Sequence, residues 1–262
     1  MRSTSLLFTA LIVVVLFRLQ FKTVNKDTLD TSIQCVYDKL DKFMRRSGEE
    51  TDEKCVIVSL GIGKDVKAET EMKKSLSDCS FYGADPVNDT NADLFENIGK
   101  FYNVAVGHKN GTLRSYILED VYRYLEVPVI DLATFIDKNV RRKTIDQMMI
   151  DIERAEYPVL PFLEAGGVLS RRDINICQIN IEIHRPNPGD LDLFMQWLER
   201  NFETRQWIFI NSEIHHAFRH IRLFMINGLS PYCYDKYFRS DAEKKLNQGP
   251  DLREMLNAHM IN

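Results

Sequence analysis

The stretch Val56-Ile57-Val58-Ser59-Leu60-Gly61-Ile62-Gly63 is the strongest indication of how this chain folds. A short apolar run that ends in glycines predicts a buried strand followed by a sharp turn, as in sheets whose strands alternate with helices. The backbone at Gly61 and Gly63 can turn tightly and approach a ligand closely, because glycine has no side chain. Such pairs also occur in ordinary turns, and this one lacks the third glycine of the dinucleotide fingerprint, with Lys64-Asp65 in its place.

An acidic residue follows the glycine pair at the distance expected of a nucleoside site. Asp85 ends a second apolar strand, Phe81-Tyr82-Gly83-Ala84-Asp85-Pro86, about twenty residues further along. A carboxylate in this position can accept hydrogen bonds from ribose hydroxyls. Alternatively, Asp85 forms a turn before Pro86. The first interpretation predicts a nucleoside-containing cofactor above the first two strands.

Strands and helices alternate along the chain, which indicates an α/β fold with a doubly wound, mostly parallel sheet. Asn110-Gly111 predicts a hairpin-type turn, with residues 112–118 as the returning segment. Asp131 is expected to cap a short helix that extends to residue 138. The other predicted strands are residues 55–60, 80–84, 102–106, 148–152, 174–183, 207–210 and 221–226, and the other predicted helices of this domain are 68–76, 91–100, 156–163 and 191–202.

The strand predicted at residues 174–183 continues into an unusual polar row. Side chains alternate across a strand, so one face is apolar while the other carries Gln178, Asn180, Glu182 and His184. Polar groups are costly to bury without partners, so such a row marks a place where a sheet meets a ligand. Together with Asp151-Ile152-Glu153, which follows the preceding strand, it predicts a binding or catalytic cleft.

Four motifs occur in a fixed order along the chain. They are Val58-Ser59-Leu60-Gly61-Ile62-Gly63, Gly83-Ala84-Asp85-Pro86, Asn103-Val104-Ala105-Val106-Gly107 and Ile150-Asp151-Ile152-Glu153-Arg154-Ala155-Glu156-Tyr157. In this order they resemble the FkbM-type, S-adenosylmethionine-dependent methyltransferases, over about residues 54–230. The most specific element is the Asp-x-Glu-x-Ala-Glu block, followed by a helix and the polar strand with Glu182 and His184.

The resemblance implies a class I methyltransferase-like Rossmann fold. Its seven strands would lie in the order 3-2-1-4-5-7-6, with the seventh antiparallel. The implied cofactor is S-adenosylmethionine, with Gly61 and Gly63 at its methionine end and Asp85 at its ribose. Asp151, at the end of the fourth strand, would lie near the reacting methyl group.

One position departs from the family pattern. The family usually has glycine where this chain has Arg154. A small residue there would leave space beside the donor or the acceptor. An arginine could instead bind an acidic acceptor, pair with Glu153 or Glu156, or obstruct the pocket of a noncatalytic relative.

Methyl transfer to oxygen needs alignment and often a base that takes the hydroxyl proton. The candidates are Asp151, Glu153, Glu182 and His184, of which His184 or Glu182 is favoured as the base. The structural alternatives are a loop imidazole at His184, before Arg185-Pro186, and salt bridges from Glu153 and Glu156 to Arg154 or Lys143.

A metal site is chemically conceivable from Asp151, Glu182, His184 and either His215 or His216. The sequence shows no compact ligand spacing among these residues, so no metal is expected. A surface turn explains His215-His216 as well as a substrate loop would.

The composition indicates one globular domain with appendages. The chain has 262 residues, of which 44% are hydrophobic. The 34 Lys and Arg residues are nearly balanced by 38 Asp and Glu residues, for a formal charge of −4. No long basic run with interleaved aromatic residues is present, so nucleic acid is not an expected partner.

The N-terminus predicts an address in the secretory pathway. Residues 6–17 are almost entirely apolar, and the flanking basic residues without a small-x-small cleavage site favour a signal anchor over a cleaved signal peptide within residues 1–22. A helical stem at 23–53, a methyltransferase-like domain at 54–240 and a helical tail at 241–262 would follow. Glycosylation tripeptides at Asn88 and Asn110 favour a lumenal domain, or a secreted one after cleavage.

Five cysteines are widely spaced, without the Cys-x-x-Cys pairs of zinc or redox sites; they are Cys35, Cys55, Cys79, Cys177 and Cys233. Cys55 and Cys177 lie in apolar strands and are expected to be buried thiols. In a lumenal domain at least one cysteine must stay unpaired.

These observations predict a membrane-anchored or secreted methyltransferase that methylates an oxygen of a small molecule, glycan or lipid. The alternative is a noncatalytic lumenal binding protein that retains the fold. A nucleotide-sugar enzyme is a third and less favoured alternative. It remains open because ribose capture by Asp85 would serve either cofactor. The sequence assigns neither the acceptor nor the oligomeric state.

Overall fold

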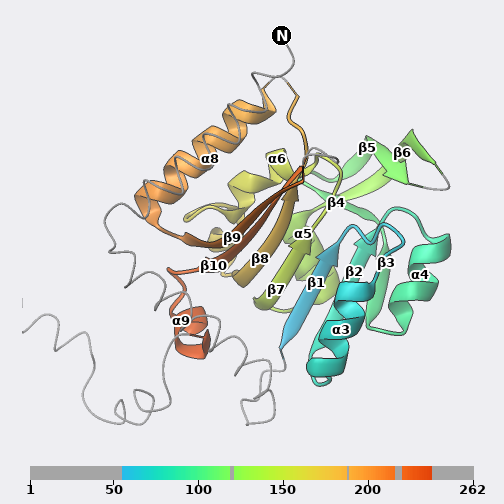
Figure 1. Cartoon of the computed structure of the whole chain (residues 1–262), viewed down its shortest axis with the longest axis horizontal. Coiled ribbons are helices and arrows are strands. Elements are labelled where there is room, and N and C mark those ends of the chain that lie inside the picture. Colours follow the sequence, from blue (N-terminus) through green and yellow to red (C-terminus); the bar gives the residue numbers. More distant parts are fainter. Residues whose placement is uncertain (1–54, 119–120, 188, 216–219, 238–262) are drawn as a thin grey trace, which may run out of the picture.

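The computed structural model describes residues 55–118, 121–187, 189–215 and 220–237 (Figure 1). The predicted anchor, stem and C-terminal tail lie outside these residues. Among the described residues, no helix is both long enough and apolar enough to span a membrane.

The centre of the structure is a seven-stranded sheet in the order β3-β2-β1-β7-β8-β10-β9. Neighbouring strands are parallel from β3 to β8, whereas β10 is antiparallel to both β8 and β9. This is the predicted order 3-2-1-4-5-7-6 with an antiparallel seventh strand. The strands are β1 (Val56–Leu60), β2 (Ser80–Asp85), β3 (Lys100–Asn103), β7 (Thr144–Ile150), β8 (Asn175–Ile183), β9 (Trp207–His215) and β10 (His220–Asn227).

Helical segments cover both faces of the sheet. All five residues of β1 are buried, as expected of a central parallel strand with helices on both sides. Ile57 faces a smaller cluster with Phe81 and Phe95, while Val56, Val58 and Leu60 face the main core. The segments are α3 (Lys67–Ser75), α4 (Asp89–Glu96), α5 (Leu132–Phe135), the π-helix η1 (Ile136–Val140), α6 (Glu156–Val159), the 3-10 helix η2 (Leu160–Leu163), α7 (Val168–Arg171), α8 (Asp190–Thr204) and α9 (Pro231–Tyr237).

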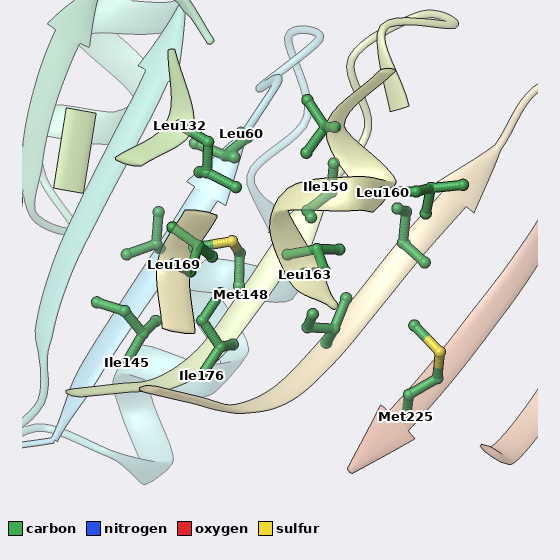
Figure 2. Close-up of a cluster of buried hydrophobic side chains, with 14 of the residues drawn as sticks. Leu60, Leu132, Ile145, Met148, Ile150, Leu160, Leu163, Leu169, Ile176 and Met225 are labelled. Carbon is green, nitrogen blue, oxygen red and sulfur yellow. The ribbon is translucent and has the colours of Figure 1, made fainter. Parts of the chain in front are cut away.

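The main core lies between the central strands and the short helical segments from α5 to α7. Figure 2 shows Met148 and Ile150 of β7 in this layer together with Leu132 of α5 and Leu163 of η2. On the far side of the core, Trp197 of α8 is fully buried. This packing holds the carboxyl ends of β1, β7 and β8 in a fixed arrangement.

The predicted third strand and the hairpin after it differ from the structure. Residues 102–106 divide between β3 and a separate strand, β4 (Ala105–Gly107). A second sheet has the order β4-β6-β5, in which β5 (Gly111–Leu118) pairs with β6 (Tyr122–Asp131) and not with β4. The hairpin predicted at Asn110-Gly111 is therefore wrong. The side chain of Asn110 instead bonds to Asp131 at the end of β6, which turns the chain away from β4.

The helix predicted at residues 156–163 consists of two short segments, α6 and η2. Pro161 lies in the first turn of η2 and has no N–H with which to continue the hydrogen bonding of α6. The predicted cap is confirmed, since the Asp131 carboxylate accepts a hydrogen bond from Thr134 N at 2.9 Å. The helix and strand predictions elsewhere match the observed elements to within a few residues at most ends.

The prediction of buried thiols at Cys55 and Cys177 is wrong, because each forms a disulfide. Cys55 is bonded to Cys79, with a Cα–Cα distance of 4.6 Å, and Cys177 to Cys233, at 5.2 Å. The register of the sheet explains the first pair: Val56 lies beside Ser80, so the residues that precede β1 and β2 are neighbours. The second pair joins β8 to α9. Neither contact is visible in cysteine spacing alone.

Candidate active site

A cavity of about 480 Å³ lies at the carboxyl ends of the central parallel strands. Its volume falls within the range of small-molecule sites, and its position is where open α/β sheets bind ligands. The loop after β1, the ends of β2 and β7, and the β5–β6 hairpin form its walls. The predicted site residues that line it are Gly61, Gly63, Asp85, Asp151, Glu153 and Glu182.

The two glycines of the bend have different roles. Gly61 has a φ of +82°, and a Cβ placed there would lie 1.7 Å from the backbone oxygen of Asp151. Gly63 has a φ of +57°, yet no atom of the described chain lies within 4 Å of a Cβ built there. Gly61 therefore permits contact between the ends of β1 and β7, whereas Gly63 leaves open space in the wall of the cavity.

Asp85 is buried beside the glycine bend. Its Oδ2 accepts hydrogen bonds from the N–H groups of Ile62 at 2.8 Å and Gly63 at 3.3 Å, while its Oδ1 accepts one from Val87 N at 2.7 Å. The carboxylate thus fixes the bend. An ionised carboxylate offers about four acceptor positions, so the three backbone bonds leave capacity for a ligand hydroxyl.

Asp151 follows β7 directly and places its carboxylate between the glycine bend and β8. Its backbone N–H donates to Leu60 O at 2.8 Å, which fixes it beside β1. Desolvation by the surrounding protein raises the pKa of Asp151 to about 7, and the charge of Glu182 adds to this effect. The side chain nevertheless remains 54% accessible to water. A carboxyl group with such a pKa can gain and lose a proton near neutral pH.

His184 lies immediately behind the cavity wall, at the end of β8. Its Nδ1 is 3.0 Å from Oε1 of the fully buried Glu156, and its Nε2 lies 3.6–3.7 Å from oxygens of Asp151, Glu153 and Glu182. Burial by itself lowers the pKa of His184, but the hydrogen bond and charge of Glu156 outweigh it and raise the pKa to about 9. His184 follows the last residue of β8 and is a loop residue, but these contacts fix its imidazole beside the site.

Glu182 contacts two residues that the sequence did not single out. Its Oε2 accepts a hydrogen bond from Arg222 Nε at 2.7 Å, and its Oε1 lies 2.6 Å from His220 Nδ1. Both partners belong to β10, whose Arg222 lies directly opposite Glu182 in the sheet register. The sequence pattern that indicates these two residues is the alternation of His220 and Arg222 with apolar residues. It occurs in a strand that was expected to be apolar.

A profile of the methyltransferase FkbM domain matches residues 38–230 of the chain. The chain belongs to the FkbM methyltransferase family. The matched segment contains the motifs that carry the resemblance, and membership in this S-adenosylmethionine-dependent family confirms the expected cofactor. No curated protein matches the chain.

Solved structures similar to this FkbM chain are methyltransferase-type proteins at low identity. Fibrillarin of Aeropyrum pernix, in complex with natively bound S-adenosyl-L-methionine, is 11% identical with a TM-score of 0.36, over 72% of this chain and 74% of that chain. Human methyltransferase-like protein 13, in complex with SAH, is 10% identical with a TM-score of 0.40, over 86% and 98%. These are likenesses of fold.

The Arg154 that replaces the family glycine of FkbM proteins does not line the cavity. It has a φ of +81°, the left-handed conformation that favours glycine. Its Nη2 lies 3.5 Å from Asp190, at the start of α8. The substitution therefore keeps the glycine-type backbone and directs the guanidinium toward α8, so it does not obstruct the pocket.

The predicted salt bridges of Glu153 and Glu156 to Arg154 or Lys143 are not found. Glu153 accepts a hydrogen bond from Tyr122 OH at 2.7 Å, and Glu156 accepts one from Ile152 N at 3.0 Å. Lys143 is paired with Asp137 instead. In this FkbM domain, Glu153 of the acidic block lines the cavity, and Glu156 lies behind it.

The β5–β6 hairpin forms part of the cavity wall. Leu113 and Val129 contribute apolar wall, and Tyr122 joins the hairpin to Glu153 through its hydroxyl. The ring of His215 lies 4.9 Å from that of His220, and its Nε2 lies 3.2 Å from Glu213, while His216 lies outside the described residues. Only the first of these two histidines can therefore be placed near the site.

Proposed function

We propose that the protein transfers a methyl group from S-adenosylmethionine to a hydroxyl oxygen of a small-molecule, glycan or lipid acceptor. The observation that carries the proposal is that one cavity joins the glycine bend and Asp85 to Asp151 and Glu182. The first group suits a nucleoside donor, and the second provides proton acceptors. The β5–β6 hairpin encloses the side on which an acceptor would lie.

The residues present fit the donor. Gly63 leaves room at the bend, and Asp85 retains acceptor capacity for a ribose hydroxyl. When bound, S-adenosylmethionine supplies a methyl group whose S–C bond breaks as the O–C bond to the acceptor forms. The chain itself supplies alignment, through the fixed bend, and part of the cavity wall, through the hairpin.

Asp151 is the proton acceptor in this proposal. Glu182 is engaged by Arg222 and His220, and Nδ1 of His184 is engaged by Glu156. Asp151 presents an accessible carboxylate to the cavity next to the bend. It takes the hydroxyl proton as the acceptor oxygen bonds to the methyl carbon, which leaves the ether product neutral.

The donor site is tested by titrating the full chain with S-adenosylmethionine in a calorimeter. Asp85→Ala should weaken binding by at least about tenfold, the effect of losing one charge-assisted hydrogen bond or more. Asp93→Ala on the exposed face of α4 is the matched control and should bind like the wild type. Absence of saturable binding by the wild-type protein would overturn the proposal.

Catalysis is tested with methyl-labelled S-adenosylmethionine and a panel of hydroxyl-bearing small molecules, glycans and lipids. The proposal expects label transfer to one of these classes and a loss of about 100-fold or more in Asp151→Asn, in line with the typical contribution of a general base. Donor binding without transfer to any class would favour the noncatalytic alternative. Competition by a nucleotide sugar for the donor site would favour the alternative of a nucleotide-sugar enzyme.

We further propose that the domain works in the lumen of the secretory pathway or after secretion. Two disulfides among the described residues support an oxidising compartment. Asn88 is exposed at the start of α4, whereas Asn110 is exposed but bonded to Asp131. Expression in a secreting cell should therefore give a glycosidase-sensitive shift that Asn88→Gln removes. A protein without any glycan and with reduced cysteines would contradict this location.

A further inference from the structure

Two imidazoles and a carboxylate meet behind the cavity wall, and Glu182 is the one of the three that lines the cavity. Glu182 belongs to β8, His184 directly follows that strand, and His220 begins β10, the neighbouring strand. We refer to these three residues as the histidine–glutamate cluster. Each offers one metal-ligating atom, and the three atoms lie within 4.8 Å of one another.

The spacing within the cluster suits a single ion. Glu182 Oε1 lies 2.6 Å from His220 Nδ1 and 3.6 Å from His184 Nε2. Metal–ligand bonds of about 2.0–2.2 Å place two ligands of one ion about 3.0–3.6 Å apart. An ion would replace the contact between Glu182 and His220 and move these two atoms apart by about 0.4 Å, whereas the separation of Glu182 from His184 already fits.

A buried carboxylate behind the cluster orients one of its ligands. Glu156, with 0% exposure, contacts His184 Nδ1 at 3.0 Å, so that Nε2 points into the cluster. Metal-bound histidines usually carry such a carboxylate on their second nitrogen. The Oε2 atom of Glu156 is buried and has no hydrogen-bond partner within the described part of the chain, which is unusual for a carboxylate.

The surroundings add negative charge and an open coordination position. Asp151 and Glu156 also present ligand atoms within 4.8 Å of His184, and Asp151 Oδ1 lies 3.7 Å from Nε2 on the cavity side. Glu153 contributes a further oxygen at 3.6 Å. Arg222, whose Nε lies 2.7 Å from Glu182 Oε2, offsets part of this carboxylate charge; a divalent cation would offset the rest, and the cavity would supply its remaining ligands.

We propose that Glu182, His184 and His220 bind a divalent first-row transition metal ion, with Glu156 as a positioning residue behind His184. Two imidazoles and one carboxylate suit zinc, manganese or iron better than magnesium, which prefers oxygen ligands. The side facing Asp151 is left for an acceptor oxygen.

The site also narrows the acceptor class, and this step rests on the proposed function. An ion held beside Asp151 polarises the hydroxyl group that Asp151 deprotonates, and a second adjacent oxygen can complete the coordination. The expected acceptor is therefore a molecule with two neighbouring oxygens, such as a vicinal diol or a hydroxy acid. No oxidant or reductant is required, since the ion acts only as a Lewis acid.

Metal binding is tested without any acceptor. Chelator-treated full-length protein is titrated calorimetrically with Zn²⁺, Mn²⁺ and Mg²⁺ in turn. The proposal expects saturable binding of Zn²⁺ or Mn²⁺ near one ion per chain, and at least about tenfold weaker binding of Mg²⁺. Glu182→Gln and His220→Ala should abolish it, and Glu156→Gln should weaken it by about 10–100-fold.

His108→Ala is the matched control, because His108 follows β4 and does not line the cavity. It should bind the metal like the wild type. The isosteric Glu182→Gln change guards against misfolding, which circular dichroism checks in each variant. The proposal is overturned if neither Zn²⁺ nor Mn²⁺ binds, if binding survives Glu182→Gln and His220→Ala, or if Mg²⁺ binds equally well.

Failure of this inference is separable from failure of the proposed function. Donor binding is measured on the same protein with and without metal. Loss of S-adenosylmethionine binding alone would contradict the methyltransferase proposal and leave the metal site standing. Donor binding without any metal binding would do the reverse.

Discussion

The two glycines of the bend show how much one side chain can decide at the residue scale. Gly61→Ala should lower the free energy of unfolding by at least about 3 kcal/mol or prevent folding, because the added Cβ meets the Asp151 oxygen at 1.7 Å. Gly63→Ala should cost only about 1 kcal/mol, the strain of its left-handed backbone. Urea unfolding measures both. The opposite ranking would refute the assignment of their roles.

Arg154 provides a second residue-scale prediction. Arg154→Gly should leave stability unchanged or raise it by up to about 1 kcal/mol, since relief of the left-handed strain outweighs the partly exposed ion pair with Asp190. Arg154→Ala loses the ion pair but keeps the Cβ, and should be less stable than Arg154→Gly. Equal stability of the two variants would show that backbone strain is not decisive here.

The site residues that could be predicted from the sequence are those that directly follow a parallel strand. Gly61, Gly63, Asp85 and Asp151 follow apolar strands, and parallel strands bring their carboxyl ends to one edge. Arg222 and His220 were missed because β10 is antiparallel, so its beginning reaches that edge. Tyr122 was missed because the hairpin register depends on long-range pairing, which no local pattern encodes.

The cap of α5 gives a prediction at the scale of an element. Burial by itself raises the pKa of Asp131, but hydrogen bonds from Thr134 and Asn110 outweigh it and hold the pKa below its ordinary value. A carboxyl group with a depressed folded pKa stabilises the protein above its unfolded pKa of about 3.9. This stabilisation is lost as the pH falls through the folded value.

Asp131→Ala should therefore lower the free energy of unfolding by about 1 kcal/mol at pH 7, the usual contribution of an N-cap. The difference from the wild type should shrink below about pH 4, because protonation then removes the charge that the variant lacks. Denaturant unfolding at pH 7 and pH 3 measures it. A constant difference at both values would contradict a charged cap.

Helices and strands could be predicted where an apolar run or a regular apolar face was present in the sequence. β1 was recognisable as a nearly continuous apolar run, and β8 as an alternation of apolar and polar residues. The α6–η2 segment was mistaken for one helix, although Pro158 and Pro161 were visible, because apolar spacing alone does not separate a helix from two turns. β6 was not predicted as a strand. Asn110 suggested a turn between β4 and β5, whereas its side chain bonds to Asp131 at the end of β6.

Across the whole molecule, the disulfide between Cys177 and Cys233 ties the amino end of the sheet to α9. The same region holds Asp146, which accepts a hydrogen bond from Tyr237 OH at 2.6 Å and pairs with Lys236. The double variant Cys177→Ser/Cys233→Ser should lower the free energy of unfolding by about 2–4 kcal/mol.

Its donor affinity should stay within about twofold of the wild type, because the disulfide lies at the end of β8 opposite the cavity. Thermal unfolding and S-adenosylmethionine titration measure the two effects. A large loss of affinity at unchanged stability would show that the two ends of the sheet are coupled.

The contact of Gly61 with the backbone of Asp151 also bears on how this protein could be redesigned. The loop after β1 and the loop after β7 are in direct contact at Gly61 and Asp151, so randomising either loop would disturb the other. The β5–β6 hairpin stands apart from that junction and reaches it through Tyr122. Mutant libraries seeking new acceptors should therefore concentrate diversity at Leu113 and Tyr122, which are less buried than Val129 of the same hairpin.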